Sequence, residues 1–152
     1  MDRLIMAIAT GFGLGYLPKA PGTWGTLLGL PIYLALARLS LPDYLIALAI
    51  IIVVAVLTAG SAEKILDRAD PGAVVIDEVA GLLVTLIGAP VNPIVLALGF
   101  IYFRIFDITK PFPANFFDKN FHGGLGIVLD DLMAGLYALI LLQATCRLFG
   151  LN

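Results

Sequence analysis

Two pairs of adjacent acids stand out as candidates for chemistry. Asp77-Glu78 and Asp130-Asp131 each follow an apolar run, and each is followed within a few residues by Ala-Gly-Leu. One acid at the start of a helix would be enough to offset the helix dipole. Because each pair exceeds that need, we interpret the four carboxylates as ligands for a cation, with helix capping as the simpler alternative.

The ligand types indicate which cation this would be. The small Ala-Gly pairs allow two helices to approach closely, which brings their acidic ends together. Carboxylates gathered beside apolar segments would repel one another unless a cation lay between them. The sequence offers oxygen ligands there and no cluster of histidine or cysteine, a pattern that favours Mg²⁺ over Zn²⁺.

The segment before Pro111 adds two bases and a fifth acid. Arg104, Asp107 and Lys110 are spaced so that they lie along one face at the end of a predicted helix. Ionisable residues at the edge of apolar segments are candidates for function. In the alternative interpretation, the two bases merely extend to a membrane interface, but this does not account for Asp107.

A loop rich in glycine and proline covers residues 11–25. It fixes Lys19 between Pro18 and Pro21 and ends at Thr23, just ahead of an apolar helix. Backbone N–H groups, an ammonium group and a helix N-terminus together suit the binding of phosphate. A plain turn with Thr23 as the N-cap is the alternative, and the loop lacks the ending of a P-loop.

Composition places the chain among membrane proteins. Hydrophobic residues make up 61% and charged residues 13%, and the mean hydropathy is +1.03, far from the balance of soluble domains. The 152 residues suit a single domain, 1–152, and the net charge of -2 provides no basic surface for nucleic acid. The N-terminal apolar run is short for a signal peptide, and we expect it to be retained.

Apolar segments predict an all-α fold, a compact bundle of about five helices that is embedded or partly embedded in the membrane. The segments are Trp24–Leu39, Leu45–Ala59, Val79–Phe103 and Leu132–Phe149. The third is broken at Gly88–Pro93, and it is either one kinked span or two helices joined by a hairpin.

The distribution of charge favours the hairpin. With it, residues 1–22, 60–78 and 104–131 share one side, which carries seven of the nine bases and ten of the eleven acids. The positive-inside rule predicts that this side is cytoplasmic.

Two segments on this side have simpler interpretations. The spacing of Glu63, Lys64, Asp67 and Arg68 is that of a solvated, paired helix face. We interpret residues 114–122 as an interfacial connector.

Four motifs, taken together, resemble the phosphatidylglycerophosphatase A family. They are Pro18–Gly25, Asp77–Gly81, Phe103–Pro113, and Gly123-Gly124 through Asp130-Asp131 with Ala134-Gly135. The resemblance implies an all-helical protein of the cytoplasmic (inner) membrane. From the apolar segments and the positive-inside rule, we expect it to be multi-pass with its active site facing the cytoplasm. The resemblance also implies a Mg²⁺-dependent phosphatase that converts phosphatidylglycerophosphate to phosphatidylglycerol, in the route to cardiolipin. Its partners would be the phospholipid substrate and the bilayer, and a homo-oligomer is left open.

Roles for the charged residues follow as a hypothesis. The expected catalytic and metal ligands are Asp77, Glu78, Asp107, Asp130 and Asp131. Bound Mg²⁺ would polarise the phosphoryl group and lower the pKa of a water molecule, with Asp131 as one choice of general base. The expected phosphate-binding residues are Lys19, Thr23, Arg104 and Lys110, which would neutralise charge as it develops.

Two other functions compete with this hypothesis. A small transporter or channel subunit predicts charges near the middle of the spans, whereas the charges of this sequence lie at their ends. A lipid-binding protein without enzymatic activity would not need paired acids together with a lysine-bearing glycine loop.

Overall fold

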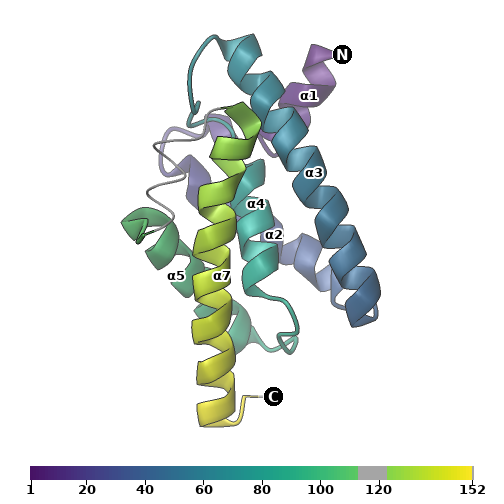
Figure 1. Ribbon diagram of the computed structural model, residues 1–152, viewed down its shortest axis with the longest axis vertical. Coiled ribbons are helices and arrows are strands. Elements are labelled where there is room, and N and C mark those ends of the chain that lie inside the picture. Colours follow the sequence, from purple (N-terminus) through teal and green to yellow (C-terminus); the bar gives the residue numbers. More distant parts are fainter. Residues whose placement is uncertain (113–122, 152) are drawn as a thin grey trace.

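The computed structural model describes residues 1–112 and 123–151, and it is all-α over these ranges, as predicted (Figure 1). They contain six α-helices and one 3₁₀ helix, so the expectation of about five helices was slightly too low. The additional helix is α1, Asp2–Ala9. The predicted connector at 114–122 lies outside the described residues.

The remaining elements follow in chain order. They are η1 (Leu14–Tyr16), α2 (Pro21–Leu36), α3 (Leu41–Leu66), α4 (Ile76–Thr85), α5 (Pro93–Thr109) and α7 (Gly123–Phe149). Local sequence explains two of the starts. The Ser40 hydroxyl accepts the Asp43 N–H at the start of α3, and the Asn92 side chain accepts the Ile94 N–H at the start of α5. Pro93 occupies the first position of α5, where its missing N–H costs nothing.

The third apolar segment is a hairpin, as the charge distribution indicated. α4 ends at Thr85, α5 begins at Pro93, and residues 86–92 connect them. Two side chains from other helices fix this connection. The Tyr33 hydroxyl donates to the Ala89 carbonyl (2.5 Å), and the Gln143 amide donates to the Ile87 carbonyl (2.9 Å). The turn is therefore tied to α2 and α7 and does not depend on its own sequence alone.

Helix α7 runs along the length of the bundle and packs against α3, α4 and α5 (Figure 1). The core between these helices includes the fully buried side chains of Leu82, Leu83, Leu86, Phe103 and Leu142. By length and composition, α3 and α7 are the two described helices that could cross a membrane. Half of the most apolar window of α7 is buried inside the protein, so this is weak evidence of membrane association.

Of the helix boundaries that differ from the expectation, two bear on the charged residues. α7 begins at Gly123, not at Leu132, so Asp130 and Asp131 lie inside a helix and not at its N-terminus. Capping therefore does not explain them. α3 extends to Leu66, which places Glu63 and Lys64 in its last turn.

Candidate active site

The close crossing of α4 and α7 brings the two acid pairs together. A Cβ atom built on Gly81 of α4 would lie 2.8 Å from the carbonyl oxygen of Asp131, and one built on Gly135 of α7 would collide with the carbonyl oxygen of Gly81. Only glycine at these positions allows such an approach of the two backbones. The Ala-Gly pairs thus act as the sequence suggested, with their glycines at the crossing.

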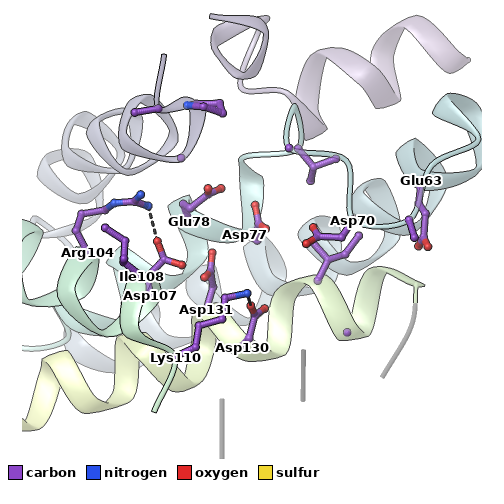
Figure 2. Close-up of a pocket in the computed structure, with 18 of the residues that line it drawn as sticks. Glu63, Asp70, Asp77, Glu78, Arg104, Asp107, Ile108, Lys110, Asp130 and Asp131 are labelled. Atoms are coloured by element: carbon purple, nitrogen blue, oxygen red, sulfur yellow. Dashed lines mark hydrogen bonds and ion pairs between the residues drawn. The ribbon is translucent and has the colours of Figure 1, made fainter. Parts of the chain in front are cut away.

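Three of the predicted ligands form one cluster at this crossing. Asp77, Glu78 and Asp131 each offer a carboxylate oxygen, and these oxygens lie within 4.8 Å of one another. Asp77 and Asp131 are buried, with 8% and 4% of their surface exposed, and Glu78 is partly buried. Figure 2 shows the three side chains pointing into a common space.

The cluster has the properties of a cation site. Burial raises the pKa of Asp77 well above its usual 3.8, and the neighbouring carboxylates of Glu78 and Asp131 raise it further. Burial also raises the pKa of Glu78, although a hydrogen bond from Asp77 opposes this shift. Asp77 Oδ1 and Glu78 Oε2 are buried and make no hydrogen bond within the described part of the chain. A hard cation would satisfy these oxygens and remove the repulsion.

The other two predicted ligands pair with bases beside the cluster (Figure 2). Arg104 Nη1 lies 2.5 Å from Asp107 Oδ2, within one turn of α5. Lys110 Nζ donates to Asp130 Oδ2 at 2.6 Å, which links the end of α5 to α7. The five carboxylates therefore divide into a cluster of three and two ion-paired acids.

The backbone after α5 is held so that Lys110 faces α7. Lys110 caps the helix in the left-handed conformation, with φ of 40°. Two residues later, the carbonyl oxygen of Phe112 accepts a hydrogen bond from the Tyr137 hydroxyl of α7 (2.9 Å). The Tyr137 ring also contacts Phe106, at 5.6 Å between ring centroids. These contacts orient the turn that carries the lysine.

A cavity of about 560 Å³ joins all of these groups. Residues 20–22 at the N-terminus of α2 form one part of its wall, and α3, α4, α5, α7 and the loop before α4 form the rest. The three charged segments predicted to share one side therefore do meet at one end of the bundle. A buried acidic cluster next to two bases, within one cavity, can hold a divalent cation and a phosphate group together.

Comparison with known proteins identifies the family. A family model described as Phosphatidylglycerophosphatase A matches residues 7–146. The chain belongs to the phosphatidylglycerophosphatase A family. This membership supports lipid phosphatase activity and implies a phospholipid substrate.

Relatives named as phosphatidylglycerophosphatase A agree with this assignment. The protein of that name from Escherichia coli (strain K12) is 38% identical over 84% of this chain and 75% of its own length. The one from Haemophilus influenzae is 34% identical over 92% of this chain and 87% of its own. A Bacteroides thetaiotaomicron protein named "Putative phosphatidylinositol-3-phosphatase" is 39% identical over 97% of this chain and 96% of its own. No solved structure matches the chain.

In this chain, two of the predicted phosphate-binding residues, Lys19 and Thr23, do not line the cavity. Lys19 is exposed, and its carbonyl accepts a hydrogen bond from the Trp24 indole (3.1 Å). Thr23 lies in the first turn of α2 and is not its N-cap, which is Ala20. Within this motif Ala20, Pro21 and Gly22 line the cavity, and a Cβ atom built on Gly22 would collide with Glu78 Oε1 and lie 2.9 Å from Arg104 Nη1.

Sequence reasoning gave no site role to Glu63, Asp70 and Ile108, which also line the cavity. Glu63 and Asp70 lie at the end away from Arg104, and Ile108 lies beside Arg104 (Figure 2). Glu63 was assigned to a solvated face because its spacing to Lys64 and Asp67 suggested surface pairs. Ile108 stands between Asp107 and Lys110 in the basic motif, and this position was the one signal available for it.

Proposed function

We propose that the chain is a Mg²⁺-dependent phosphatase that hydrolyses the terminal phosphate monoester of phosphatidylglycerophosphate and releases phosphatidylglycerol. The observation that carries this proposal is the buried cluster of Asp77, Glu78 and Asp131 beside Arg104 and Lys110 in one cavity. We further propose that residues 1–152 act as a single domain in the cytoplasmic membrane, with the cavity on the cytoplasmic side.

The cluster of three carboxylates would hold the cation. Bound Mg²⁺ supplies Lewis acidity to the phosphoryl group and lowers the pKa of water. The partnerless oxygens of Asp77 and Glu78 support its placement here. One carboxylate of the cluster, for which we propose Asp131, accepts the proton of the attacking water.

The bases would bind the phosphate. Arg104 offers a planar fork of donors suited to phosphate oxygens, and Lys110 offers a compact positive charge. Asp107 and Asp130 keep these bases oriented toward the cavity. When the substrate binds, its phosphate would replace the acid as the partner of each base. Attack by water agrees with the sequence, in which His122 is the single histidine, too few for a phosphohistidine route.

A second substrate has support from one relative. The name of the Bacteroides thetaiotaomicron protein points to a phosphatidylinositol phosphate, which is also a phosphate monoester on a lipid head group. The same metal and base arrangement would serve either substrate. The choice between them therefore rests on turnover.

The experiment measures phosphate release by the purified protein in mixed micelles. Phosphatidylglycerophosphate, phosphatidylinositol 3-phosphate and phosphatidic acid are compared, each with Mg²⁺ and with EDTA. We expect release from phosphatidylglycerophosphate to be fastest and to stop with EDTA. Faster phosphate release from phosphatidylinositol 3-phosphate would make that lipid the substrate instead. No release from any of the three lipids would favour a transporter subunit or a lipid-binding protein.

Asp107 and Asp130 provide a second test. Asp107→Asn and Asp130→Asn each remove the charge that orients a base. Both variants should lower kcat/KM while the protein remains folded in the membrane. Full Mg²⁺-dependent activity in both variants would contradict the proposed roles of these acids.

A further inference from the structure

The two ends of the cavity differ in chemistry. Figure 2 shows Arg104 and Ile108 at one end and Glu63 and Asp70 at the other, with Asp77 between them. All five residues line the same cavity. One end thus joins an apolar side chain to a base that is ion-paired with Asp107, and the other end carries the acids Glu63 and Asp70.

Among the described residues that line the cavity, Ile108 is the large apolar side chain that is exposed, at 71%. It is the last member of an exposed apolar stripe on α5. The stripe consists of Ile94, Ala97, Ile101, Ile105 and Ile108, with isoleucine exposures of 59%, 48%, 49% and 71% in chain order. Successive members are three or four residues apart, so they lie on one helix face.

The length of the stripe suits contact with lipid. Its 14 residue steps span about 21 Å at about 1.5 Å per residue, more than the roughly 15 Å of one leaflet, which is half of the hydrocarbon core. The described helices leave this face uncovered. An apolar face therefore leads along α5 and ends at the cavity.

We propose that Ile105 and Ile108 form the subsite for the acyl-glycerol part of the substrate, which reaches the cavity along the outer face of α5. This inference rests on the proposed function, since it assigns the position of that substrate's apolar part. Arg104 precedes Ile108 by four residues, so a cation for phosphate and an apolar contact lie one helix turn apart. This pair matches an amphiphile that carries phosphate next to its chains.

The acidic end of the cavity, at Glu63 and Asp70, excludes a substrate whose acyl-glycerol part lies at that end. Glu63 is partly buried and Asp70 is exposed, and both are acids. A phosphate diester placed between them would be repelled, and acyl chains would bury their charges without partners. This end instead faces water, since Asp70 is exposed.

The kinetic test compares two substrates in three proteins. Long-chain phosphatidylglycerophosphate and its dibutyryl analogue are given to wild type, Ile108→Ser and the control Ile140→Ser, whose site on α7 is 61% exposed and outside the cavity. Loss of the isoleucine contact should lower kcat/KM for the long-chain lipid about tenfold. The analogue, whose short chains leave most of the stripe uncovered, should lose less than the long-chain lipid, and Ile140→Ser should change the turnover of neither substrate. Equal losses for both substrates, or no loss for the long-chain lipid, would overturn the inference.

A binding measurement separates this inference from the proposed function. Trp24 is the single tryptophan, so Trp24→Phe permits a lone tryptophan at either position, with Ile108→Trp as the probe and Ile140→Trp as the control. Phosphatidylglycerophosphate with brominated chains, at low mole fraction, should quench the probe tryptophan more than brominated phosphatidylcholine does. The control tryptophan should be quenched to the same extent by both lipids. Preferential quenching of the probe, together with no turnover of phosphatidylglycerophosphate by the wild-type protein, would retain the subsite and reject the phosphatase. Equal quenching of the probe by both lipids would reject the subsite.

Discussion

Gly81 lies directly against the backbone of Asp131, because a Cβ atom on Gly81 would stand 2.8 Å from the Asp131 carbonyl oxygen. The two residues belong to α4 and α7, the helices that carry the acid pairs. This contact sets the distance between Asp77 and Asp131. The spacing of the proposed metal ligands is thus a consequence of helix packing.

Gly81→Ala should separate the two helices. The added methyl group would meet the Asp131 carbonyl and the Phe103 ring, and we expect a loss of about 2 kcal/mol in the free energy of unfolding. Phosphatase activity should fall more steeply than stability, since the ligands move apart. Thermal denaturation and phosphate release check this, with Ala144→Ser on the exposed face of α7 as the control. Unchanged activity in Gly81→Ala would contradict the role of the contact.

Asp77→Asn should affect stability and activity in opposite directions. In the absence of Mg²⁺ the substitution removes a buried charge that Glu78 and Asp131 repel, so the melting temperature of the metal-free protein should rise. Activity should fall roughly 100-fold or more, and the stabilisation by Mg²⁺ should disappear. Asp43→Asn, at an exposed site that bonds Ser40, is the control and should leave activity and the response to Mg²⁺ unchanged. A lower melting temperature for Asp77→Asn without metal would show that the carboxylate is stabilised by the protein alone.

Stability of the metal-free protein should fall as pH rises. Because burial and neighbouring carboxylates raise the pKa of folded Asp77 above 3.8, the folded protein binds more protons than the unfolded chain above that value. The contribution of this group is complete below pH 3.8 and is lost as pH rises through the raised pKa. Glu78 shifts in the same direction from 4.5. Melting temperatures with and without Mg²⁺ should therefore differ more at about pH 8 than at about pH 5, and a smaller difference at the higher pH would contradict the site.

Arg104 and Lys19 should differ in importance. Arg104 lines the cavity and is mostly buried, whereas Lys19 is exposed and outside it. We expect Arg104→Gln to lower kcat/KM about 100-fold and Lys19→Ala to lower it less than about fivefold, because exposed charges are screened. A larger effect of Lys19→Ala would support the phosphate-binding role that the sequence indicated for the lysine.

The sequence predicted the fold and the meeting of the acid pairs because both depend on regular spacing. Apolar runs predicted the helices, and Ala-Gly next to each acid pair predicted the crossing. The prolines near residue 90 allowed a kink or a hairpin, and the distribution of charge favoured the hairpin. The start of α7 was not predictable from the same signals. Gly124 resembles a loop residue, yet it is helical, and glycine is needed there because a Cβ atom would collide with the Val56 carbonyl of α3.

Partners across helices were beyond the reach of the sequence. The spacing of Arg104, Asp107 and Lys110 indicated a shared face, but Lys110 instead turns toward Asp130 after a left-handed cap. The glycine-rich loop was assigned to phosphate through Lys19, whereas Gly22 is the residue that approaches Arg104. Side-chain direction at the end of a helix or in a loop depends on tertiary contacts that spacing does not encode.

The most direct test of the central claim is phosphate release from phosphatidylglycerophosphate by wild type and by Asp131→Asn, each with Mg²⁺ and with EDTA. We predict release only from the wild type with Mg²⁺. Release that persists in EDTA, or equal release by Asp131→Asn, would contradict a metal-dependent phosphatase built on this cluster.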